Sequence, residues 1–305
     1  MSMRPRQRGA AVILAMLVVL IASLLATYMA EQQDLWQQQV EAQFNWGQAR
    51  QVGNAAIDWA RAVLADDAMT ASYDYPGELW TKRLPAATVD EGEIVGYIED
   101  QQGRFNLNNL VQNGVASPPD VARFQRLLAL IGLPTDLVYP LVDWMDTDCA
   151  PENPGGAEDA YYLALPHPYR TANRPLVEVD ELLLVKGYDA ATVQRLRPYV
   201  SVLPEPTPIN VNFAQPEVLS AMIDGLPLSM ARQLVQERAS RPFASVADFN
   251  SRLPAHLQAV EGVATVSTQY FMVTGNATFG RSQVVMEALL SRTGTQSKVI
   301  WQTIK

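Results

Sequence analysis

Hydrophobic and polar positions separate the first 30 residues from the rest of the chain. Residues 10–30 are almost entirely apolar, and no charged side chain occurs between Arg8 and Glu31. As a helix this run would be roughly 30 Å long, which matches the hydrocarbon core of a bilayer. Arg4 and Arg6 also precede the run. Because basic residues favour the cytoplasmic side, the pattern predicts a transmembrane helix with its N-terminus in the cytoplasm.

The helical pattern continues beyond the apolar run, but with one apolar face. Apolar side chains recur every three to five residues from Leu35 to Leu64, with glutamines and charged residues between them. This spacing predicts one continuous helix from about Ala10 to about Ala65. A secretory signal peptide has a shorter apolar region and a small-x-small cleavage site, which this run lacks. A plain signal anchor is the alternative that stays open.

Two groups of strands flank a helical block in the remaining pattern. Strands are predicted at 93–99 and 104–107, and short helices between about 118 and 253. Short turns join three further predicted strands, which indicates an antiparallel meander: 268–278, 283–290 and 298–304. The pattern therefore predicts an α+β fold, in which the long helix packs on an antiparallel sheet and a large all-α domain is inserted.

These elements divide the chain into five segments. They are a basic N-terminal segment (1–9), the transmembrane half of the helix (10–30), the rest of the helix with the first strands (31–109), the inserted helical domain (110–265) and the C-terminal strands (266–305). The insert alone has the size of an ordinary domain.

Composition and charge narrow the classes of function. The chain has 305 residues and a formal net charge of −9, which argues against general binding of nucleic-acid phosphates. Its single cysteine, Cys149, cannot form an internal disulfide, so an exported body would have to be stable without one. No P-loop, Gly-x-Ser-x-Gly or His-Glu-x-x-His motif occurs, and we expect no enzymatic activity.

Acidic residues are concentrated in the predicted loop after residue 145. Asp143, Asp146 and Asp148 are followed by two glycines and then by Glu158 and Asp159. Ca²⁺ takes six to eight oxygen ligands, so this concentration of carboxylates makes the loop a candidate calcium site. The spacing is not that of an EF-hand. The alternative is a solvated acidic loop that caps the following helix.

The N-terminal pattern resembles that of type IV prepilins and pseudopilins. Their shared features are a short basic leader, a glycine, an apolar segment and a continuing amphipathic helix. The resemblance implies that a prepilin peptidase cleaves between Gly9 and Ala10. Family members usually carry Glu at the fifth mature position, where this chain has Leu14. In the family that Glu pairs with the N-terminal amine of a neighbouring subunit, so its absence points to a subunit at the tip.

The insert sharpens the resemblance. Three motifs together are similar to the K-type minor pseudopilin family of type II secretion: Asp143-Trp144-x-Asp146-x-Asp148, Gly156-Ala157-Glu158-Asp159 and Asn173-Arg174-Pro175-Leu176 with Glu181. This resemblance implies a structural Ca²⁺ with Asp146, Asp148, Glu158 and Asp159 as ligands. Asp143 and Asn173 are further candidates for binding the metal or ordering the loop.

The same resemblance implies a function and a location. The chain would cap or initiate the periplasmic pseudopilus and so support export of folded proteins across the outer membrane. Its partners would be the I- and J-type minor pseudopilins, the prepilin peptidase and the secretion platform of the inner membrane. It would cross the inner membrane of a Gram-negative bacterium once, with a periplasmic body.

A rival interpretation rests on residues 209–249. They resemble a helix-hairpin-helix module, which would make the chain a nucleic-acid-binding protein of a DNA-uptake system. Such hairpins bind phosphate through backbone amides in a Gly-x-Gly turn, whereas this turn is Gly225-Leu226-Pro227-Leu228. Pro227 removes one amide donor. The expectation is therefore a helical fold used for protein contacts, with no nucleic-acid partner.

Overall fold

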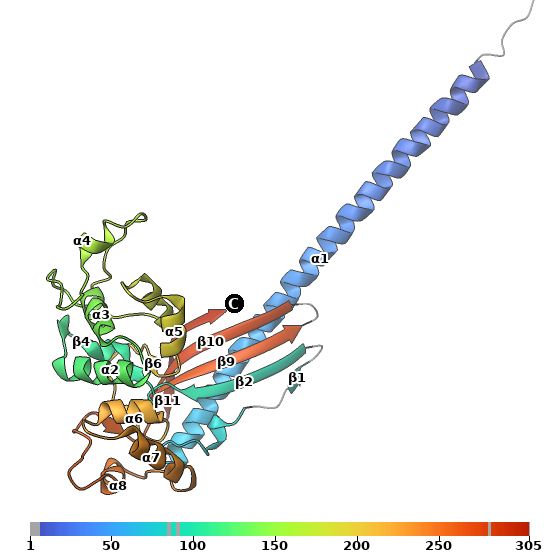
Figure 1. Cartoon of the computed structure of the whole chain (residues 1–305). Coiled ribbons are helices and arrows are strands. Elements are labelled where there is room, and N and C mark those ends of the chain that lie inside the picture. Colours follow the sequence, from blue (N-terminus) through green and yellow to red (C-terminus); the bar gives the residue numbers. More distant parts are fainter. Residues whose placement is uncertain (1–6, 84–86, 90–91, 280–281, 305) are drawn as a thin grey trace, which may run out of the picture.

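The long N-terminal helix is the dominant feature of the computed structural model, which describes residues 7–83, 87–89, 92–279 and 282–304 (Figure 1). Helix α1 runs without interruption over Gln7–Thr70, which confirms the predicted continuous helix and extends it by about one turn at each end. Gly9 and Ala10 lie within its first turns, while residues 1–6 of the leader are outside the described residues. The first half of α1 projects away from the body (Figure 1).

A five-stranded antiparallel sheet forms the first part of the body. Its order is β1-β2-β9-β10-β11. The bounds are Ala87–Val89 (β1), Gly92–Asp100 (β2), Tyr270–Phe279 (β9), Ser282–Thr293 (β10) and Gln296–Ile304 (β11). The last three strands confirm the predicted meander, and β9 also pairs with β2, so strands about 170 positions apart in the sequence close one sheet.

The second half of α1 packs on this sheet through small and branched side chains. Ile57, Ala60 and Leu64 are buried against Phe271 and Met286, among other residues of β2, β9 and β10. Their three- and four-residue spacing places them on one helix face. The amphipathic half of α1 is therefore anchored to the sheet, which confirms the predicted α+β arrangement.

The chain between β2 and β9 forms a separate helical body (Figure 1). Its helices are α2 (Pro118–Leu130), α3 (Val138–Met145), α4 (Asp159–Tyr162), α5 (Ala190–Leu196), α6 (Pro216–Met222), α7 (Leu228–Ser240) and α8 (Val246–Ser251). A 3₁₀ turn at Leu79–Thr81 lies before β1, outside this body. Within the body, 3₁₀ turns lie at Leu107–Leu110, Thr135–Leu137 and Val179–Leu184, and two-residue strands at Phe105–Asn106 (β3), Val111–Gln112 (β4), Val115–Ala116 (β5), Val200–Ser201 (β6), Ile209–Asn210 (β7) and Ala264–Thr265 (β8). One continuous core joins these elements, from Phe105 to Leu257.

The predicted return strand at 104–107 is wrong in both length and partner. Only Phe105–Asn106 is extended, and it pairs in parallel with β6 of the insert instead of returning beside β2. The cause is the Asn106 side chain, which accepts a hydrogen bond from the backbone N–H of Asn108 and caps a 3₁₀ turn. The chain leaves the sheet at this point.

Three buried asparagines connect the first residues of the insert to later segments of it, at Leu176 and at residues 203–207. The side chain of Asn106 donates to the carbonyl of Glu205, and its oxygen accepts from the N–H of Leu203. Asn108 donates to the carbonyls of Leu176 and Leu203, and Asn109 donates to that of Thr207. An amide side chain can donate and accept at once, which explains why this motif is asparagine instead of an acid or a hydroxyl.

Asp100 makes the junction between sheet and insert sensitive to pH. Its buried carboxylate accepts hydrogen bonds from Thr268 Oγ1 at 2.6 Å and from the N–H of Gly103 at 2.5 Å. Burial raises the pKa of Asp100 to about 6, although these hydrogen bonds oppose the shift. The folded state therefore holds the proton more tightly than the unfolded state does, so this group favours folding below about pH 4 and loses that contribution as the pH rises to 6.

We expect this loss to be about 2–3 kcal/mol between pH 4 and pH 7. The measurement is urea unfolding of the wild type and of Asp100→Asn in detergent at both pH values. All other titratable groups are the same in both proteins. The free energy of unfolding of the wild type should therefore fall by about 2–3 kcal/mol relative to that of the variant between pH 4 and pH 7. A stability difference that is the same at both pH values would contradict the prediction.

Candidate metal centre in the inserted domain

Helices α3 and α4 hold the acidic loop between them. Helix α3 is strongly apolar and is buried along most of its length, so its C-terminal end is fixed in the core. Asp146 follows immediately and its N–H still donates to the carbonyl of Val142. Glu158 directly precedes α4. The two ends of the loop are therefore held close together by regular elements.

Three of the predicted ligands meet in this loop. Carboxylate oxygens of Asp146, Asp148 and Glu158, one from each, lie within 4.8 Å of one another. Asp146 and Glu158 are buried, and Asp148 is exposed to solvent. Asp146 Oδ1 and Glu158 Oε1 are buried and accept no hydrogen bond from any residue that the structure describes. Buried oxygens without partners are costly, so these residues fit a cation that prefers oxygen ligands.

The electrostatics of the cluster lead to the same conclusion. Burial, followed by the negative charges of Asp148, Asp143 and Glu152, raises the pKa of Asp146 to about 7. Burial and the carboxylates of Asp143, Asp146 and Asp148 likewise raise the pKa of Glu158 to about 7. Like charges in a desolvated site oppose ionisation, and a divalent cation would remove that opposition.

Asp143 orders the loop from beneath. Its carboxylate is fully buried and accepts hydrogen bonds from the N–H groups of Glu152 at 3.0 Å and Ala157 at 2.5 Å. Gly156 lies against this carboxylate, and a Cβ there would be 2.6 Å from the nitrogen of Glu152. These hydrogen bonds fit the loop-ordering role, which is one of the two roles predicted for Asp143, and the choice between the two stays a prediction.

Asp159 and Asn173 lie outside the three-carboxylate cluster. Asp159 Oδ1 accepts from both the N–H and the hydroxyl of Thr171 at 3.0 Å, and its Oδ2 lies 3.2 Å from Arg170 Nη1. Asn173 donates its N–H to the carbonyl of Trp144 at 3.0 Å and has a positive φ of 47°. Asp159 thus attaches the segment after α4 to α4 itself, and Asn173 attaches it to α3. Their role as metal ligands stays a prediction.

Other residues of the motifs stabilise the surroundings of the loop. Trp144 donates its indole N–H to Glu181, which also pairs with Arg174 at 3.1 Å. Lys186 donates to the carbonyls of Gly155 and Gly156 and lies over the ring of Tyr161. Sequence reasoning missed the role of Lys186, because the lysine follows the loop by about 30 positions and no local pattern connects the two.

The arginines near the α6–α7 hairpin are engaged within the insert. Arg238 is buried and donates to the carbonyl of Val211 at 2.5 Å. Arg232 lies 3.9 Å from Glu217, and Arg241 lies 3.7 Å from Asp248. Burial gives Arg238 a structural role, whereas the side chains of Arg232 and Arg241 are mostly exposed and each lies near an acidic side chain.

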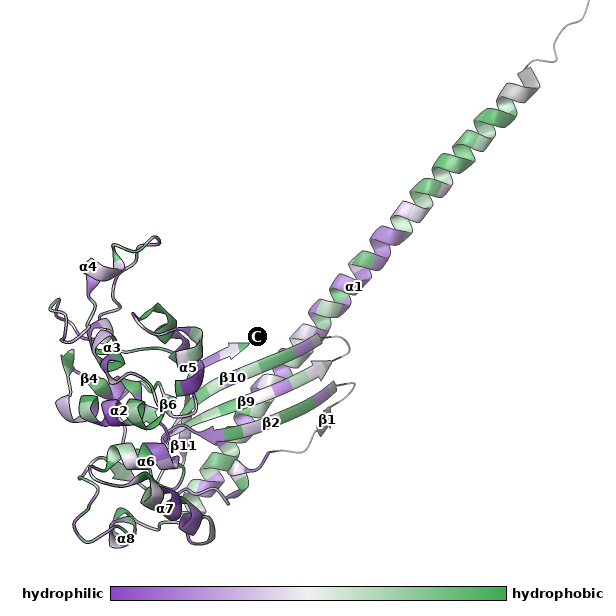
Figure 2. Cartoon of the chain, in the orientation of Figure 1, coloured by the Kyte–Doolittle hydropathy of each residue, from purple (hydrophilic) through white to green (hydrophobic). Residues whose placement is uncertain are grey.

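The membrane-length helix completes the set of functional features. Within the described residues, α1 is the one helix long and apolar enough to cross a membrane, judged by length and composition. Its first half is apolar on all sides, and its second half alternates between apolar and polar (Figure 2). Such a helix, continuing into a helix packed on an antiparallel sheet, defines the chain as a pseudopilin, and the helical insert distinguishes it within that class.

Comparison with known proteins identifies the family. Two family models, both described as type II secretion system protein K, match the chain over residues 103–205 and residues 209–270. The chain belongs to this family. It is 35% identical to the type II secretion system protein K of Pseudomonas aeruginosa, over 97% of this chain and 92% of that protein. It is also 35% identical to that of Klebsiella pneumoniae, over 98% of this chain and 96% of that protein.

A solved structure shares the fold. It is the crystal structure of the GspK-GspI-GspJ complex from the type 2 secretion system of enterotoxigenic Escherichia coli. The TM-score is 0.78 at 25% identity, and the match covers 88% of this chain and 99% of that chain. The family and the fold together make this chain a minor pseudopilin, a structural component of type II secretion, and confirm the family and fold expected from the sequence.

Proposed function

We propose that this chain occupies the tip of the periplasmic pseudopilus, in a complex with the I- and J-type minor pseudopilins. The observation that carries the proposal is the exposed apolar face of α1 between the membrane segment and the sheet. Trp36, Val40 and Phe44 are 72%, 51% and 65% exposed, and their four-residue spacing places them on one side of the helix. A contiguous apolar face of this kind on a secreted body is typical of a protein interface.

The position at a tip follows from two further features. Leu14 stands in the membrane segment where a shaft subunit would carry a carboxylate, so this chain has no such group to pair with a subunit ahead of it. The insert forms a body of its own beside the sheet (Figure 1). Repeated along a shaft it would crowd neighbouring subunits, whereas at one end it has free space.

The metal centre has a structural role in this proposal. Asp146, Asp148 and Glu158 would hold a Ca²⁺ ion, with water and loop carbonyls completing six to eight oxygen ligands. The ion supplies positive charge that neutralises the crowded carboxylates and orders the loop. Asp143 and Lys186 hold the backbone of that loop in place by their own hydrogen bonds. We propose no catalysis at this site.

The proposal places the chain in the inner membrane, with its body in the periplasm. The prepilin peptidase would cleave between Gly9 and Ala10 on the cytoplasmic side, and the remaining helix would be held by the secretion platform until assembly. Mass spectrometry of the protein from its native membrane tests this step. We expect a chain that begins at Ala10; a chain that begins at Met1 would contradict the processing.

Co-purification tests the partner surface. The wild type, extracted in detergent from cells that also make the I- and J-type pseudopilins, should bring both partners down. Phe44→Glu should reduce their recovery at least about tenfold, since a buried charge in an apolar contact costs more than 1.4 kcal/mol. The matched control is Gln43→Glu, which adds the same charge one position away. Equal recovery with both variants would overturn the proposed surface.

A further inference from the structure

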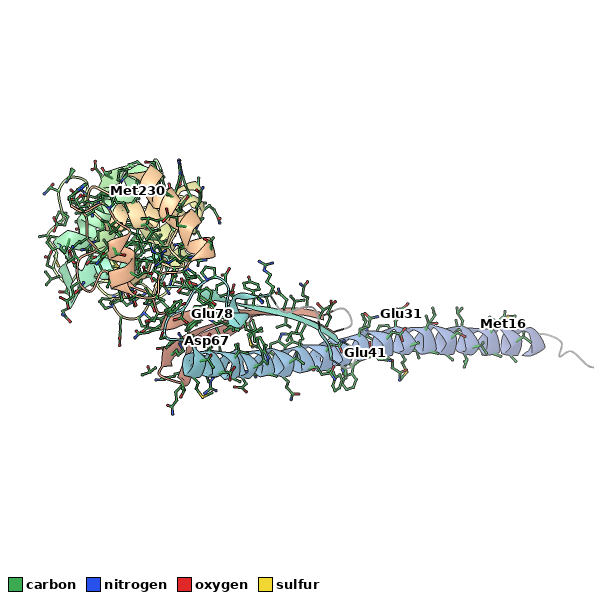
Figure 3. The ribbon with its side chains drawn as sticks, turned by 90° about the horizontal axis from the view of Figure 1, so that it is seen from below. Met16, Glu31, Glu41, Asp67, Glu78 and Met230 are labelled. Carbon is green, nitrogen blue, oxygen red and sulfur yellow. The ribbon has the colours of Figure 1, made fainter. Side chains whose placement is uncertain are left out.

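A second group of carboxylates lies far from the insert loop, where α1 ends. Oxygens of Asp67, Asp74 and Glu78, one from each, lie within 4.8 Å of one another. Asp67 belongs to the last turn of α1, and the other two residues belong to the segment that leads from the helix toward the sheet. Figure 3 labels Asp67 and Glu78 near the end of α1 that faces the insert. The group thus joins the helix to the segment that follows it.

Arg292 of β10 neutralises part of this group. Its guanidinium contacts Asp67 Oδ2 at 2.9 Å and both oxygens of Asp74 at 2.6 and 2.8 Å. Asp74 also accepts from the N–H of Thr268 at 2.6 Å. The arginine therefore pairs with Asp74 and with one oxygen of Asp67, which are two of the three carboxylates.

Glu78 is the member that this arrangement leaves uncompensated. Its residue is 8% exposed, and Oε2 accepts from the N–H of Tyr75 at 3.0 Å and from the indole of Trp80 at 2.9 Å. Its other oxygen, Oε1, is buried and accepts no hydrogen bond from any described residue. Leaving a buried acceptor without a partner costs about 1–3 kcal/mol, and more for a charged group. The unpartnered Oε1 is evidence for a bound cation that does not depend on the clustering of the three carboxylates.

The site is also accessible to an ion from solution. Asp67 and Glu78 both line a surface pocket of about 620 Å³ beside the end of α1. Hydroxyl groups of Thr70 and Ser72 line the same pocket. A cation held there could complete its shell with water, since calcium commonly combines a few protein oxygens with solvent oxygens.

We propose that Asp67, Asp74 and Glu78 form a second divalent-cation site, which takes Ca²⁺ and fastens the end of α1 to the segment that follows it. Glu78 Oε1 and a carboxylate oxygen of Asp67 are its principal ligands, and Asp74 contributes from the side that Arg292 also contacts. The ion lies in the pseudopilin body, so this site is separate from the loop of the insert.

A proton on Glu78 is the competing way to balance the charge. Burial, followed by the carboxylates of Asp67 and Asp74, raises the pKa of Glu78 to about 7. A protonated Glu78 would still leave its hydroxyl to find an acceptor, whereas an ion would satisfy Oε1 directly. The two alternatives differ in one measurable quantity, the number of calcium ions bound per chain.

Equilibrium dialysis of the full-length, chelator-stripped protein in detergent against radioactive Ca²⁺ measures that number. The background is Asp146→Asn with Glu158→Gln, which removes the ion proposed for the insert. In this background we expect residual binding of one ion per chain, and we expect Glu78→Gln to abolish it. The matched control is Asp66→Asn, an exposed neighbour that lines the same pocket and lies outside the cluster, and it should leave binding unchanged.

Melting temperatures show whether Glu78→Gln loses calcium binding because the site is changed or because the protein is unfolded. Glutamine retains the oxygen that accepts from Tyr75 and Trp80 and removes a buried negative charge. In chelator, the melting temperature of Glu78→Gln should therefore equal or exceed that of the background, while its rise on adding Ca²⁺ should be lost. Calcium binding by Glu78→Gln equal to that of the background would overturn the second site. Because the background variant already lacks the ion of the insert, a wild type that fails to bind that ion would only bind as much calcium as the background variant does. The comparison between the background variant and Glu78→Gln would still test the second site.

Discussion

Calcium should slow hydrogen exchange at the backbone amides of residues 146–158 by about 100-fold when it is present at 100 times its dissociation constant. The reason is that exchange from an ordered loop requires the ion to leave first, and an ion at that concentration adds about 2.7 kcal/mol to the free energy of opening. The amides of Glu152 and Ala157 report most directly, because both donate to Asp143 in the closed loop. Mass spectrometry of peptides from this loop provides the measurement.

Two variants separate the metal cluster from its surroundings. Asp146→Asn should lose most of the protection by calcium, because it replaces one carboxylate oxygen with an NH₂ group, which cannot bind the ion, and removes half the negative charge of the buried pair of Asp146 and Glu158. If the ligands are Asp146, Asp148 and Glu158 alone, Asp159→Asn should retain calcium-dependent protection in residues 146–158, because Asp159 bonds Thr171 and Arg170 outside the cluster. Loss of protection in Asp159→Asn would instead support the ligand role that the motif predicts for Asp159. Protection that is equal in Asp146→Asn and the wild type would contradict the proposed ligand set.

Replacing Arg292 by Met should destabilise the body by about 3–5 kcal/mol in the absence of divalent cations. Arg292 holds Asp67 and Asp74 together, donates to the carbonyl of Thr268 and lies over the ring of Phe271. Its side chain and that of Asp74 are 9% and 3% exposed. Methionine fills much of the same volume but leaves the buried carboxylates without a counter-charge, and that loss dominates. Urea unfolding in the presence of a chelator, followed by the circular dichroism of the β-sheet, measures the change in the free energy of unfolding.

A partly exposed arginine of the same body provides the control. Arg104 lies 3.8 Å from Glu99, and both side chains are partly exposed. Solvent screens such a pair, so Arg104→Met should cost less than about 1 kcal/mol. Similar losses for the two variants would contradict the assignment of Arg292 as the ion-pair anchor between α1 and the sheet.

Elements with a strong local pattern could be predicted from the sequence alone. The length and uniformity of residues 10–30 and the apolar spacing up to Leu64 were sufficient for α1, and alternation with tight turns was sufficient for β9 to β11. Residues 104–107 failed because their extended pattern is local, whereas their partner, β6, lies about 95 positions away. The hydrogen bonds of Asn106 decide that pairing, and they depend on tertiary contacts.

The candidate metal centre was predictable in composition but only partly in geometry. Residue types and spacing located the loop, and Asp146, Asp148 and Glu158 do converge. Spacing could not show that the neighbour of Glu158, Asp159, turns toward Thr171. The second cluster escaped prediction because Asp67, Asp74 and Glu78 are spread over 12 positions of a helix end and an irregular segment, and only the fold brings Arg292 to them.

The location of this chain on assembled pseudopili tests the tip assignment most directly. Pseudopili would be assembled with a version of the chain that carries an epitope after Lys305 and then labelled with gold-coupled antibody for electron microscopy. The account predicts a single label at one end of each filament. Labels distributed along the shaft would contradict it, because they would mean that a subunit with Leu14 and a large insert is accommodated between neighbours.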